Sequence, residues 1–592
     1  MKTNRLLTAS LAALLLSGAL TSCGDDDPKD ETYLPPTPSD NKGNNNGNNG
    51  ESTLPDDKPA TDLDKYVAPT YNDDYRSISG WAQKDKWNLA NVHDPSIAYF
   101  DGYYYMYGTD ASYGNEHLKN TNGRHFPGKR SKNLVDWEFV NGPFNDVPDW
   151  VLTKLNEIRK SMDLPEIASK NDVNWGYWAP VIRTVNGKLR MYYSIVVDNY
   201  IKTGKKISEA FDGSWSERAF IGMCETSDPW GGTWEDKGYV TCSSSDKGLD
   251  FTRAKQNGDW GNAYFFYNAI DPTYIVTSTG EHWLIHGSWH SGFAALQIDP
   301  TTGKPLLATD TDPWAENATL LQERFGRRIG TRTANNRWQG SEAPEVIEKD
   351  GYFYLFMAYD GLDVPYNTRV VRSKSIDGSA ESYFDITGRN FTNGRGDCYP
   401  IVTHPYKFNG SKGWVGISHC CVFQNETTKE WFYCSQGRFP NDAGGNAPNA
   451  VMLGHVRKIY WCPKSPDALD DLWPIASPER YGAVPNVAIT KDELVGKWEH
   501  IALEYKYAEQ NVSKELELKS DGTMSGALTG SWTYDAAKKY LTLEAGGVKS
   551  IVVVDRECDW ESNPRKATIV YAGIENAASA PKTFWGKKVE YF

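Results

Sequence analysis

Apolar and polar residues alternate in five short segments of the chain, and each of these segments begins at a tight turn. An alternation with a period of two residues is typical of a β-strand that buries one face. A second apolar segment precedes each turn, so each pair of segments predicts a β-hairpin. The second arms of the five hairpins are DGYYYMYG (101–108), NGKLRMYYS (186–194), TGEHWLIHG (279–287), DGYFYLFMA (350–358) and TKEWFYCSQG (428–437).

Each first arm carries one distinctive residue close to the point where the arm begins. In chain order these residues are Asp94, Trp178, Asp271, Glu342 and His419. In the first four hairpins the turn glycine follows 8, 9, 9 and 9 residues later, which indicates a shared register. A supersecondary unit repeated in this way predicts a repeat architecture.

Five antiparallel units arranged radially form a five-bladed β-propeller, in which the first strand of each blade lines the central channel. The distinctive residues are 84, 93, 71 and 77 residues apart. Because these steps exceed the roughly 40–50 residues of compact blades, we expect loop insertions in the blades. Three acids, a histidine and a tryptophan would then face one cavity. The alternative is that the Asp-Pro and Glu-Ala-Pro motifs only form turns at the start of strands.

The pattern changes beyond the proline-rich stretch 463–485. Short apolar segments follow, joined by Asp-Gly and Gly-Gly turns, and they predict a small antiparallel barrel. The predicted fold class is therefore all-β, with a propeller domain over 76–485 and an accessory barrel over 486–592. One segment, 151–162, has the pattern of a helical insertion.

The N-terminus has the pattern of a targeting segment. Lys2 and Arg5 precede the apolar run 6–20, which is shorter than the ~20 residues that a membrane span needs. The run ends in Leu-Thr-Ser-Cys23 and resembles a bacterial lipoprotein box, which implies a signal peptide over 1–23 and lipidation of Cys23. The aspartates that follow resemble a signal for the outer cell surface. We therefore expect an outer-membrane lipoprotein that contacts the membrane through its lipid only; the alternative is plain secretion with an incidental cysteine.

Residues 24–75 are rich in Asn, Gly, Pro and Asp and predict a flexible linker. Composition adds two constraints on the rest of the chain. A length of 592 residues exceeds the roughly 250–300 residues of a single core, so more than one domain is expected. With 63 Lys and Arg against 77 Asp and Glu, the net charge of −14 argues against nucleic acid as a partner. Eight cysteines beyond Cys23 lack CxxC spacing, so buried thiols or one or two bridges are the alternatives to a disulfide framework.

Residues 85–485 resemble glycoside hydrolase family 43, and the endo-α-1,5-L-arabinanases in particular. The matching stretches run through the whole predicted propeller: NVHDPSI, YWAPVI, AIDPTYI, WLIHGSWHSGFAALQIDPTTGKP, SEAPEVIEKDGYFYLF, NTRVVRSKSIDG, GISHCCVFQ and HVRKIYW. This resemblance implies endo-hydrolysis of α-1,5-linked L-arabinan, a pectic side chain, by a monomeric enzyme. The alternatives are an exo-acting α-L-arabinofuranosidase or β-xylosidase of the same fold, and a non-catalytic glycan-binding propeller.

The resemblance also implies the roles of the three acids. Asp94 corresponds to the general base, Glu342 to the general acid, and Asp271 to the acid that tunes the pKa and orientation of the general acid. Hydrolysis with inversion needs one carboxylate to activate water and one protonated carboxyl to protonate the leaving oxygen. A third acid beside Glu342 would disfavour its ionisation.

The remaining assignments concern the substrate and an ion. The resemblance implies that His419 lies on the propeller axis, where calcium binds in many family members; calcium prefers oxygen ligands, so a core histidine is the alternative. His93, Trp178 and Arg372 are assigned to substrate binding, although Trp178 could equally pack between blades. Long insertions at 111–175 and 200–265 are expected to shape the substrate groove with four aromatic residues, Trp175, Tyr177, Trp215 and Trp230.

Overall fold

The computed structural model describes residues 54, 62–71, 73, 75–110, 124–161, 164–197, 218–246, 267–289, 292–307, 314–315, 317–332, 340–362, 364–392, 396–440 and 452–589. Its strands form five four-stranded antiparallel sheets and one closed barrel, so the predicted all-β fold class is confirmed. Cys23 and the predicted signal peptide lie outside the described residues, as does most of the predicted linker. Within the described part of the chain, no helix is long and apolar enough to cross a membrane.

The five sheets are the five predicted blades, and each predicted hairpin is the inner pair of strands of its blade. Blade 1 contains β1 (Ser96–Phe100), β2 (Tyr103–Tyr107), β3 (Gly128–Ser131) and β4 (Glu138–Val140). Blade 2 contains β5 (Trp175–Val185), β6 (Lys188–Val197), β7 (Arg218–Asp228) and β8 (Thr233–Cys242). Blade 3 contains β10 (Thr273–Val276), β11 (His282–His286), β12 (Phe293–Ile298) and β14 (Arg327–Gly330).

The last two blades follow the same order. Blade 4 contains β15 (Ser341–Lys349), β16 (Tyr352–Tyr359), β17 (Asn367–Ser373) and β18 (Ile401–Thr403). Blade 5 contains β20 (Cys421–Gln424), β21 (Trp431–Gly437), β22 (Leu453–Ser465) and β23 (Ala468–Ala476). The first strands of successive blades are neighbours, and β20 also contacts β1, so the ring of blades closes around a central channel.

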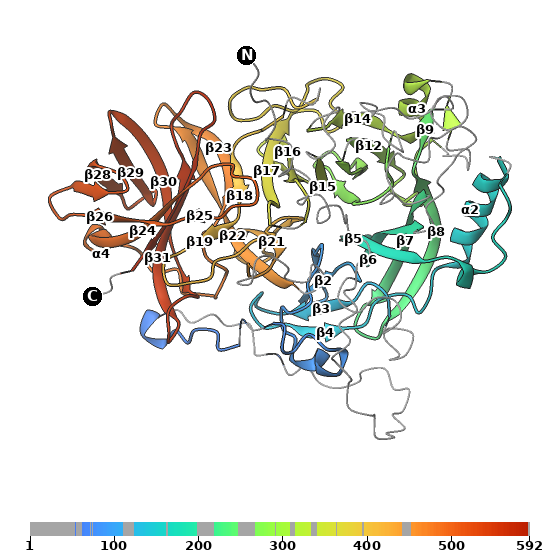
Figure 1. Cartoon of the computed structure of the whole chain (residues 1–592), viewed down its shortest axis with the longest axis horizontal. Coiled ribbons are helices and arrows are strands. Elements are labelled where there is room, and N and C mark those ends of the chain that lie inside the picture. Colours follow the sequence, from blue (N-terminus) through green and yellow to red (C-terminus); the bar gives the residue numbers. More distant parts are fainter. Residues whose placement is uncertain are drawn as a thin grey trace, which may run out of the picture.

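Shorter elements decorate the blades. The predicted helix is α2 (Asp149–Ser161), which lies beside β8 at the edge of the molecule (Figure 1). The other short elements are η1 (Leu63–Lys65), η2 (Trp81–Lys86), η3 (Lys170–Asp172), β9 (Ser245–Asp246), β13 (Trp314–Ala315) and α3 (Ala318–Phe325). All eight described cysteines are buried and unbridged, so they are buried thiols and form no disulfide bridges among themselves.

A buried carboxylate on β15 joins the blades across the channel. Glu345 accepts hydrogen bonds from Thr273 Oγ1 at 2.6 Å and from the Val422 N–H at 3.1 Å. It also pairs with Arg183 at 2.7 Å, and the Arg183 guanidinium lies 3.4 Å from Ser96 Oγ. These five residues come from the five different blades, so the side chains of Glu345 and Arg183 together link all the inner strands.

The C-terminal region is a closed barrel of eight strands, as its turn pattern predicts. Tryptophan and leucine side chains, among them Trp498, Trp532 and Leu541, fill its interior. The strands are β24 (Gly496–Leu503), β26 (Lys514–Leu518), β27 (Thr523–Gly526), β28 (Gly530–Asp535), β29 (Tyr540–Ala545), β30 (Val548–Asp559), β31 (Lys566–Ile574) and β32 (Thr583–Lys588). The short helix α4 (Lys491–Leu494) precedes the first of them.

The barrel packs against blade 5 of the propeller, and Figure 1 shows β22 and β23 next to β30 and β31. A further contact is the parallel pair formed by β19 (Tyr406–Lys407), which follows blade 4, and β25 (Asn511–Val512), which follows β24. Buried charges also cross this interface, since Lys458 of β22 pairs with Asp555 of β30 at 2.9 Å.

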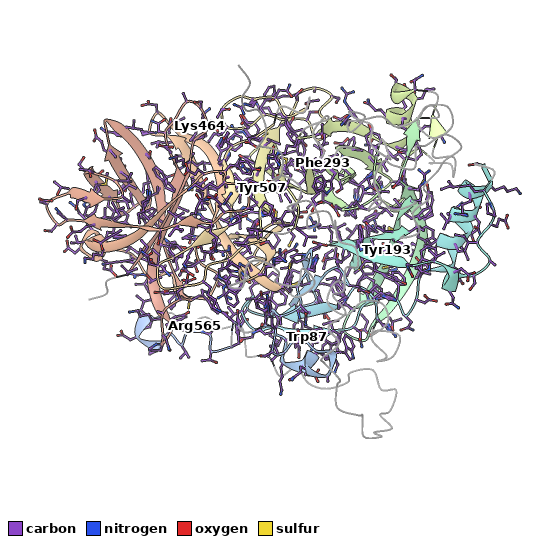
Figure 2. The ribbon with its side chains drawn as sticks, in the orientation of Figure 1. Trp87, Tyr193, Phe293, Lys464, Tyr507 and Arg565 are labelled. Atoms are coloured by element: carbon purple, nitrogen blue, oxygen red, sulfur yellow. The ribbon has the colours of Figure 1, made fainter. Side chains whose placement is uncertain are left out.

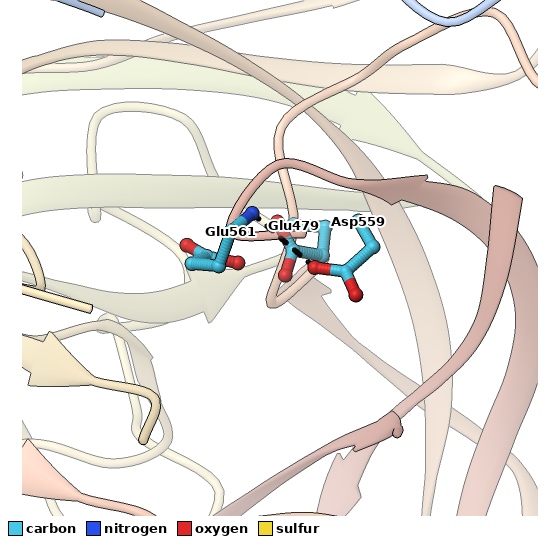
Figure 3. A group of neighbouring side chains, drawn as sticks. All are labelled: Glu479, Asp559 and Glu561. Carbon is cyan, nitrogen blue, oxygen red and sulfur yellow. Dashed lines mark hydrogen bonds between the residues drawn. The ribbon is translucent and has the colours of Figure 1, made fainter. Parts of the chain in front are cut away.

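Three acids gather around one lysine at the same interface. Lys587 Nζ lies 3.0 Å from Glu479, 3.0 Å from Asp559 and 2.5 Å from Glu561. The three carboxylates are close enough together to hold a metal ion (Figure 3), and among the described residues they are the only such group. Because the Lys587 ammonium already contacts all three, we interpret the cluster as an ion-pair network.

The structure corrects the C-terminal limit of the predicted linker. Described residues between 62 and 75 contact the folded domains: Tyr66 donates a hydrogen bond to the Gly482 carbonyl at 2.9 Å, and Tyr75 is buried. Asp73 forms ion pairs with Arg480 and with Arg565, which lies at the edge of the barrel (Figure 2). Tyrosine side chains among the prolines and aspartates provide the apolar surface that this segment buries.

Candidate active site

The predicted residues occur where the first strand of each blade begins. One residue there has a left-handed backbone in every blade, with φ values of 48, 38, 54, 54 and 51° at Asp94, Ala179, Asp271, Ala343 and His419. The structural equivalents of Asp94 in blades 2 and 4 are therefore Ala179 and Ala343. The register expected from the sequence aligned Trp178 and Glu342 with Asp94, and in the structure each of these two residues lies one position earlier. β-bulges after Trp178 and Glu342 accompany this shift.

Asp94 is held by contacts from three blades. Its Oδ2 atom accepts a hydrogen bond from Thr109 Oγ1 at 2.6 Å, and this hydroxyl in turn accepts one from the Ala179 N–H at 2.7 Å. The Asp94 N–H donates to Gln436 Oε1 at 2.5 Å. Asp94 is only 2% exposed, so these contacts fix both its backbone and its carboxylate.

Two histidines lie against the Asp94 carboxylate. His93 Nδ1 is 3.1 Å from Oδ2, and His419 Nδ1 is 2.9 Å from Oδ1. Burial alone would raise the pKa of Asp94, but the charges of His419 and His93 outweigh burial and hold this pKa well below its usual range. Burial would lower the pKa of His419, but Asp94, Asp271 and Glu342 together raise it to about 9. Asp94 is thus an ionised carboxylate beside a cationic imidazole.

Glu342 is connected to the same group through a tyrosine. The Tyr366 hydroxyl donates to Glu342 Oε1 at 2.5 Å and lies 3.5 Å from His419 Nδ1, while Ser288 Oγ donates to Glu342 Oε2 at 3.3 Å. The contacts of 2.9, 3.5 and 2.5 Å that link Asp94 to Glu342 place their oxygens at most about 9 Å apart. This upper limit admits the roughly 6.5–9.5 Å of an inverting pair and also the roughly 5–5.5 Å of a retaining pair.

Asp271 lies beside Glu342. The Oδ2 atom of Asp271 accepts a hydrogen bond at 3.1 Å from the N–H of Ala343, the residue that follows Glu342 in the chain. Burial raises the pKa of Asp271 to about 7; His419 opposes this rise, and Glu342 and Asp94 add to it. Burial also raises the pKa of Glu342, with opposition from the Tyr366 hydrogen bond and from His419, and Asp94 raises it further. One carboxyl of the site is therefore ionised, and two buried ones hold protons more strongly than usual.

The predicted substrate residues do not all lie near the acids. Trp178 is partly exposed and packs on Val196, Ala219 and Ile270, directly before Asp271. Arg372 lies elsewhere: it pairs with Asp471 at 2.5 Å and stacks over Trp473 of blade 5. The structure therefore brings His93 and Trp178 to the acids and places Arg372 between two blades.

The insertions show a similar division. Trp175 and Tyr177 are buried, and Tyr177 stacks on His125 with the ring centroids 3.5 Å apart. Trp230 lies under the Arg130 guanidinium at 3.3 Å. Trp215 is outside the described residues. The three described aromatic residues therefore pack inside or between strands of blades 1 and 2.

Sequence reasoning did not identify four residues that contact the acids, namely Thr109, Ser288, Tyr366 and Gln436. Each lies in a second or third strand or in a loop, and none has a fixed spacing from the acid that it contacts. The available signal was the position of Thr109 and Ser288 shortly after the second hairpin arms that end in Gly108 and Gly287.

The calcium ion expected at His419 would meet a ring whose Nδ1 atom already has partners. Calcium takes 6–8 oxygen ligands, whereas His419 Nδ1 is engaged by Asp94 and Tyr366. The group of described acids that could hold a metal is the Lys587 cluster at the barrel interface. No step of the chemistry below is therefore assigned to an ion.

Together, the propeller channel and the buried acids define a candidate acid–base glycosidase. A family model described as "Glycosyl hydrolases family 43" matches residues 89–454, and a model described as "C-terminal lipocalin-like domain" matches residues 478–586. Because the first match covers more than half of the chain, the chain belongs to glycosyl hydrolase family 43. It is a glycoside hydrolase.

Two relatives align with this chain over almost their whole length. An extracellular endo-alpha-(1->5)-L-arabinanase of Thermotoga petrophila is 25% identical over 544 residues, which are 87% of this chain and 98% of the relative. An extracellular endo-alpha-(1->5)-L-arabinanase 2 of Bacillus subtilis is 24% identical over 531 residues, 86% of this chain and 95% of the relative. The crystal structure of an endo-1,5-alpha-L-arabinanase from Thermotoga petrophila RKU-1 has a TM-score of 0.60 at 22% identity, covering 85% of this chain and 99% of that chain, which supports the fold.

Proposed function

We propose that this enzyme hydrolyses internal α-1,5 linkages of L-arabinan with inversion, with Asp94 as general base, Glu342 as general acid and Asp271 as the residue that tunes Glu342. The observation that carries the proposal is the pair of buried carboxyls at the two ends of the contacts made by His419 and Tyr366, one carboxyl ionised and one with a raised pKa. The full-length relatives supply the substrate class.

In this mechanism Asp94 accepts a proton from the water that attacks the anomeric carbon. Its carboxylate is fixed by Thr109 and faces two histidines, so little reorientation is needed when the reaction begins. The contact with cationic His419 keeps Asp94 ionised but weakens it as a base. Upon protonation of Asp94, the His419 charge remains balanced by the other acids of the site.

Glu342 donates its proton to the leaving oxygen of the glycosidic bond. Burial keeps the carboxyl protonated at a pH where an exposed glutamate would be ionised. Once Glu342 has lost its proton, the Tyr366 hydrogen bond and the His419 charge stabilise the carboxylate. Asp271, whose pKa is raised to about 7, adds negative charge as it ionises and so favours the protonated form of Glu342.

Product sizing tests the proposed substrate and the endo action. With linear α-1,5-arabinan we expect arabino-oligosaccharides of several lengths at early times, and we expect no such products from a Glu342→Gln variant. Release of monomer alone would instead favour exo action, which is the activity named for an extracellular exo-alpha-(1->5)-L-arabinofuranosidase of Cellvibrio japonicus that is 25% identical over 297 residues, 49% of this chain and 66% of that relative. Cleavage of xylan alone, or of no glycan, would contradict the proposal.

We also propose that the enzyme acts as a monomer anchored by a lipid on Cys23 at the outer cell surface. The support is the lipoprotein-like segment that ends at Cys23. Cys23→Ala should convert a membrane-associated protein into a soluble one during cell fractionation, and unchanged fractionation would contradict the anchor.

A further inference from the structure

One segment of the barrel domain contacts blade 4 close to the acids. It follows β24 and ends at β25, which pairs with β19 of the propeller region. The Lys506 N–H donates to His404 Nε2 at 3.2 Å, and the Asn511 side chain lies 2.9 Å from His404 Nδ1. His404 is fully buried, so the segment is fixed to the propeller. Tyr507 of this segment is labelled in Figure 2.

Tyr505 of this segment contacts a buried ion pair of the propeller. Its hydroxyl donates to Asp360 Oδ2 at 2.9 Å, while Arg332 Nη1 lies 2.5 Å from Asp360 Oδ1. Arg332 and Asp360 are each 1% exposed. The guanidinium groups of Arg332 and Arg369 lie 5.5 and 5.3 Å from the centroid of the Tyr505 ring. The barrel thus supplies one of the hydrogen bonds that satisfy a desolvated carboxylate.

This ion pair holds the backbone that leads to Glu342. The Gly340 carbonyl accepts hydrogen bonds from the Asp360 N–H at 3.2 Å and from Arg332 Nη1 at 3.4 Å. The Arg332 N–H donates to Ser341 Oγ at 3.3 Å. Gly340 and Ser341 directly precede Glu342, so the position of the acid depends on where Arg332 and Asp360 lie.

The same carboxylate also holds the residues around Tyr366. The Asn367 side-chain amide donates to Asp360 Oδ2 at 3.3 Å and to the Pro365 carbonyl at 2.9 Å. Pro365 and Asn367 are the two neighbours of Tyr366 in the chain. Tyr366 is the residue whose hydroxyl donates to Glu342. Asp360 Oδ2 therefore accepts one hydrogen bond from the barrel and one from the loop that carries the partner of the acid.

We propose that Tyr505 is a positioning residue through which the barrel domain aligns Glu342 and Tyr366 for proton donation. The inference rests on the proposed function, because it assigns Glu342 the role of general acid. Loss of the Tyr505 hydroxyl leaves Asp360 with one donor fewer, and the segments 340–341 and 365–367 lose part of their common anchor. A small displacement of an acid reduces the rate strongly while the binding of substrate changes little.

The test uses the full chain carrying Tyr505→Phe, which keeps the ring and removes only the hydroxyl. We expect kcat on arabinan to fall about tenfold, with KM within about twofold of the wild type, since a misaligned acid affects the chemical step. An aryl arabinofuranoside, whose leaving group needs little protonation, should recover most of the lost rate. Tyr507→Phe is the matched control: this tyrosine lies in the same segment with 55% of its surface exposed, and its variant should retain wild-type kcat.

A double-mutant cycle separates alignment from general loosening of the domain contact. Adding Tyr505→Phe to the Tyr366→Phe variant should lower kcat by a clearly smaller factor than adding it to the wild type, because both hydroxyls act on the same carboxyl. Unchanged kcat for Tyr505→Phe, equal losses on both substrates, or fully multiplicative effects in the cycle would overturn the inference. A wild-type enzyme that leaves arabinan intact would instead overturn the proposed function.

Discussion

At the scale of single residues, the site depends on an unusual backbone conformation. Asp94 and Asp271 both adopt a left-handed conformation, with φ of 48 and 54°, and each is followed by proline. Aspartate tolerates this region better than most residues, and the proline directly precedes the strand that follows. The conformation turns the chain sharply at the channel mouth, so that the two carboxylates lie beside the residues of neighbouring blades.

The first prediction separates the base from the acid. Asp94→Asn and Glu342→Gln preserve shape and remove one proton-transfer group each, and each should reduce kcat on arabinan by roughly 10²–10⁴. An aryl arabinofuranoside should restore much of the rate of Glu342→Gln and none of that of Asp94→Asn. The control is Asp471→Asn, since this carboxylate pairs with Arg372 away from the acids and should keep wild-type kcat. Equal inactivity of Glu342→Gln on both substrates would show that Glu342 is not the acid.

The second prediction concerns pH. Burial is the main cause of the raised pKa of Glu342, and the Asp271 carboxyl lies beside it, against the Ala343 N–H. Asp271→Asn removes a neighbouring negative charge, so Glu342 loses its proton at a lower pH. The alkaline limb of the kcat profile should therefore shift to lower pH, while burial keeps it above the range of an exposed glutamate. A limb in the wild-type position, together with normal activity, would show that Asp271 does not tune the acid.

The residues of the site differ in how far sequence predicts them. Asp94 and Asp271 stand out because the Asp-Pro motif and the hairpin spacing are local features of the chain. Gln436 reaches Asp94 only after blade 5 has closed the ring against blade 1. Tyr366 reaches Glu342 within blade 4, across a loop whose path the local pattern does not show. The pairing of Arg372 with Asp471 could not be predicted, because a strand pattern does not show which neighbouring blade a side chain faces.

At the scale of elements, the inner strands are held by one hub. Glu345 on β15 contacts Arg183, Thr273 and the backbone of Val422, each from a different blade. It is only three residues from Glu342 in the sequence. The hub therefore fixes the strand that carries the acid relative to the strands that carry the other catalytic groups.

The third prediction tests this hub. Glu345→Ala leaves the Arg183 charge and two donors without their partner, and removing one member of a buried pair typically costs about 3–5 kcal/mol of unfolding free energy. Glu348→Ala is the control on the same strand, since its bonds to Ser278 are exposed and should contribute less than about 1 kcal/mol. Urea unfolding measures both. Equal stability of the two variants would show that the hub does not hold the blades.

At the scale of the whole molecule, sequence pattern predicts the domains better than their contacts. Alternating segments and turn glycines are repeated locally, so both the five blades and the barrel can be predicted from them. The interface cannot be predicted in this way, because Lys458, Asp555 and Lys587 look like ordinary surface charges in the sequence. Their burial becomes evident only when β22 lies against β30.

The fourth prediction concerns the Lys587 cluster in that interface. The lysine is 2% exposed and contacts Glu479, Asp559 and Glu561, and the three carboxylates raise its pKa well above the usual value even though burial opposes this. Lys587→Met keeps the length of the side chain but leaves three clustered acids without their cation. We expect a loss of about 3–5 kcal/mol in unfolding free energy.

The matched control is Lys497→Met on β24, whose lysine is 45% exposed and lies 3.9 Å from Glu515. This surface pair should contribute less than about 1 kcal/mol. If the cluster were instead a cation site that the lysine merely occupies, Lys587→Met would regain its stability on addition of calcium. Stability of Lys587→Met that equals the control, or that calcium restores fully, would contradict an ion-pair network. Unfolding followed separately in the two domains should show the loss in both, because the cluster joins Glu479, which follows blade 5, to the strands of the barrel.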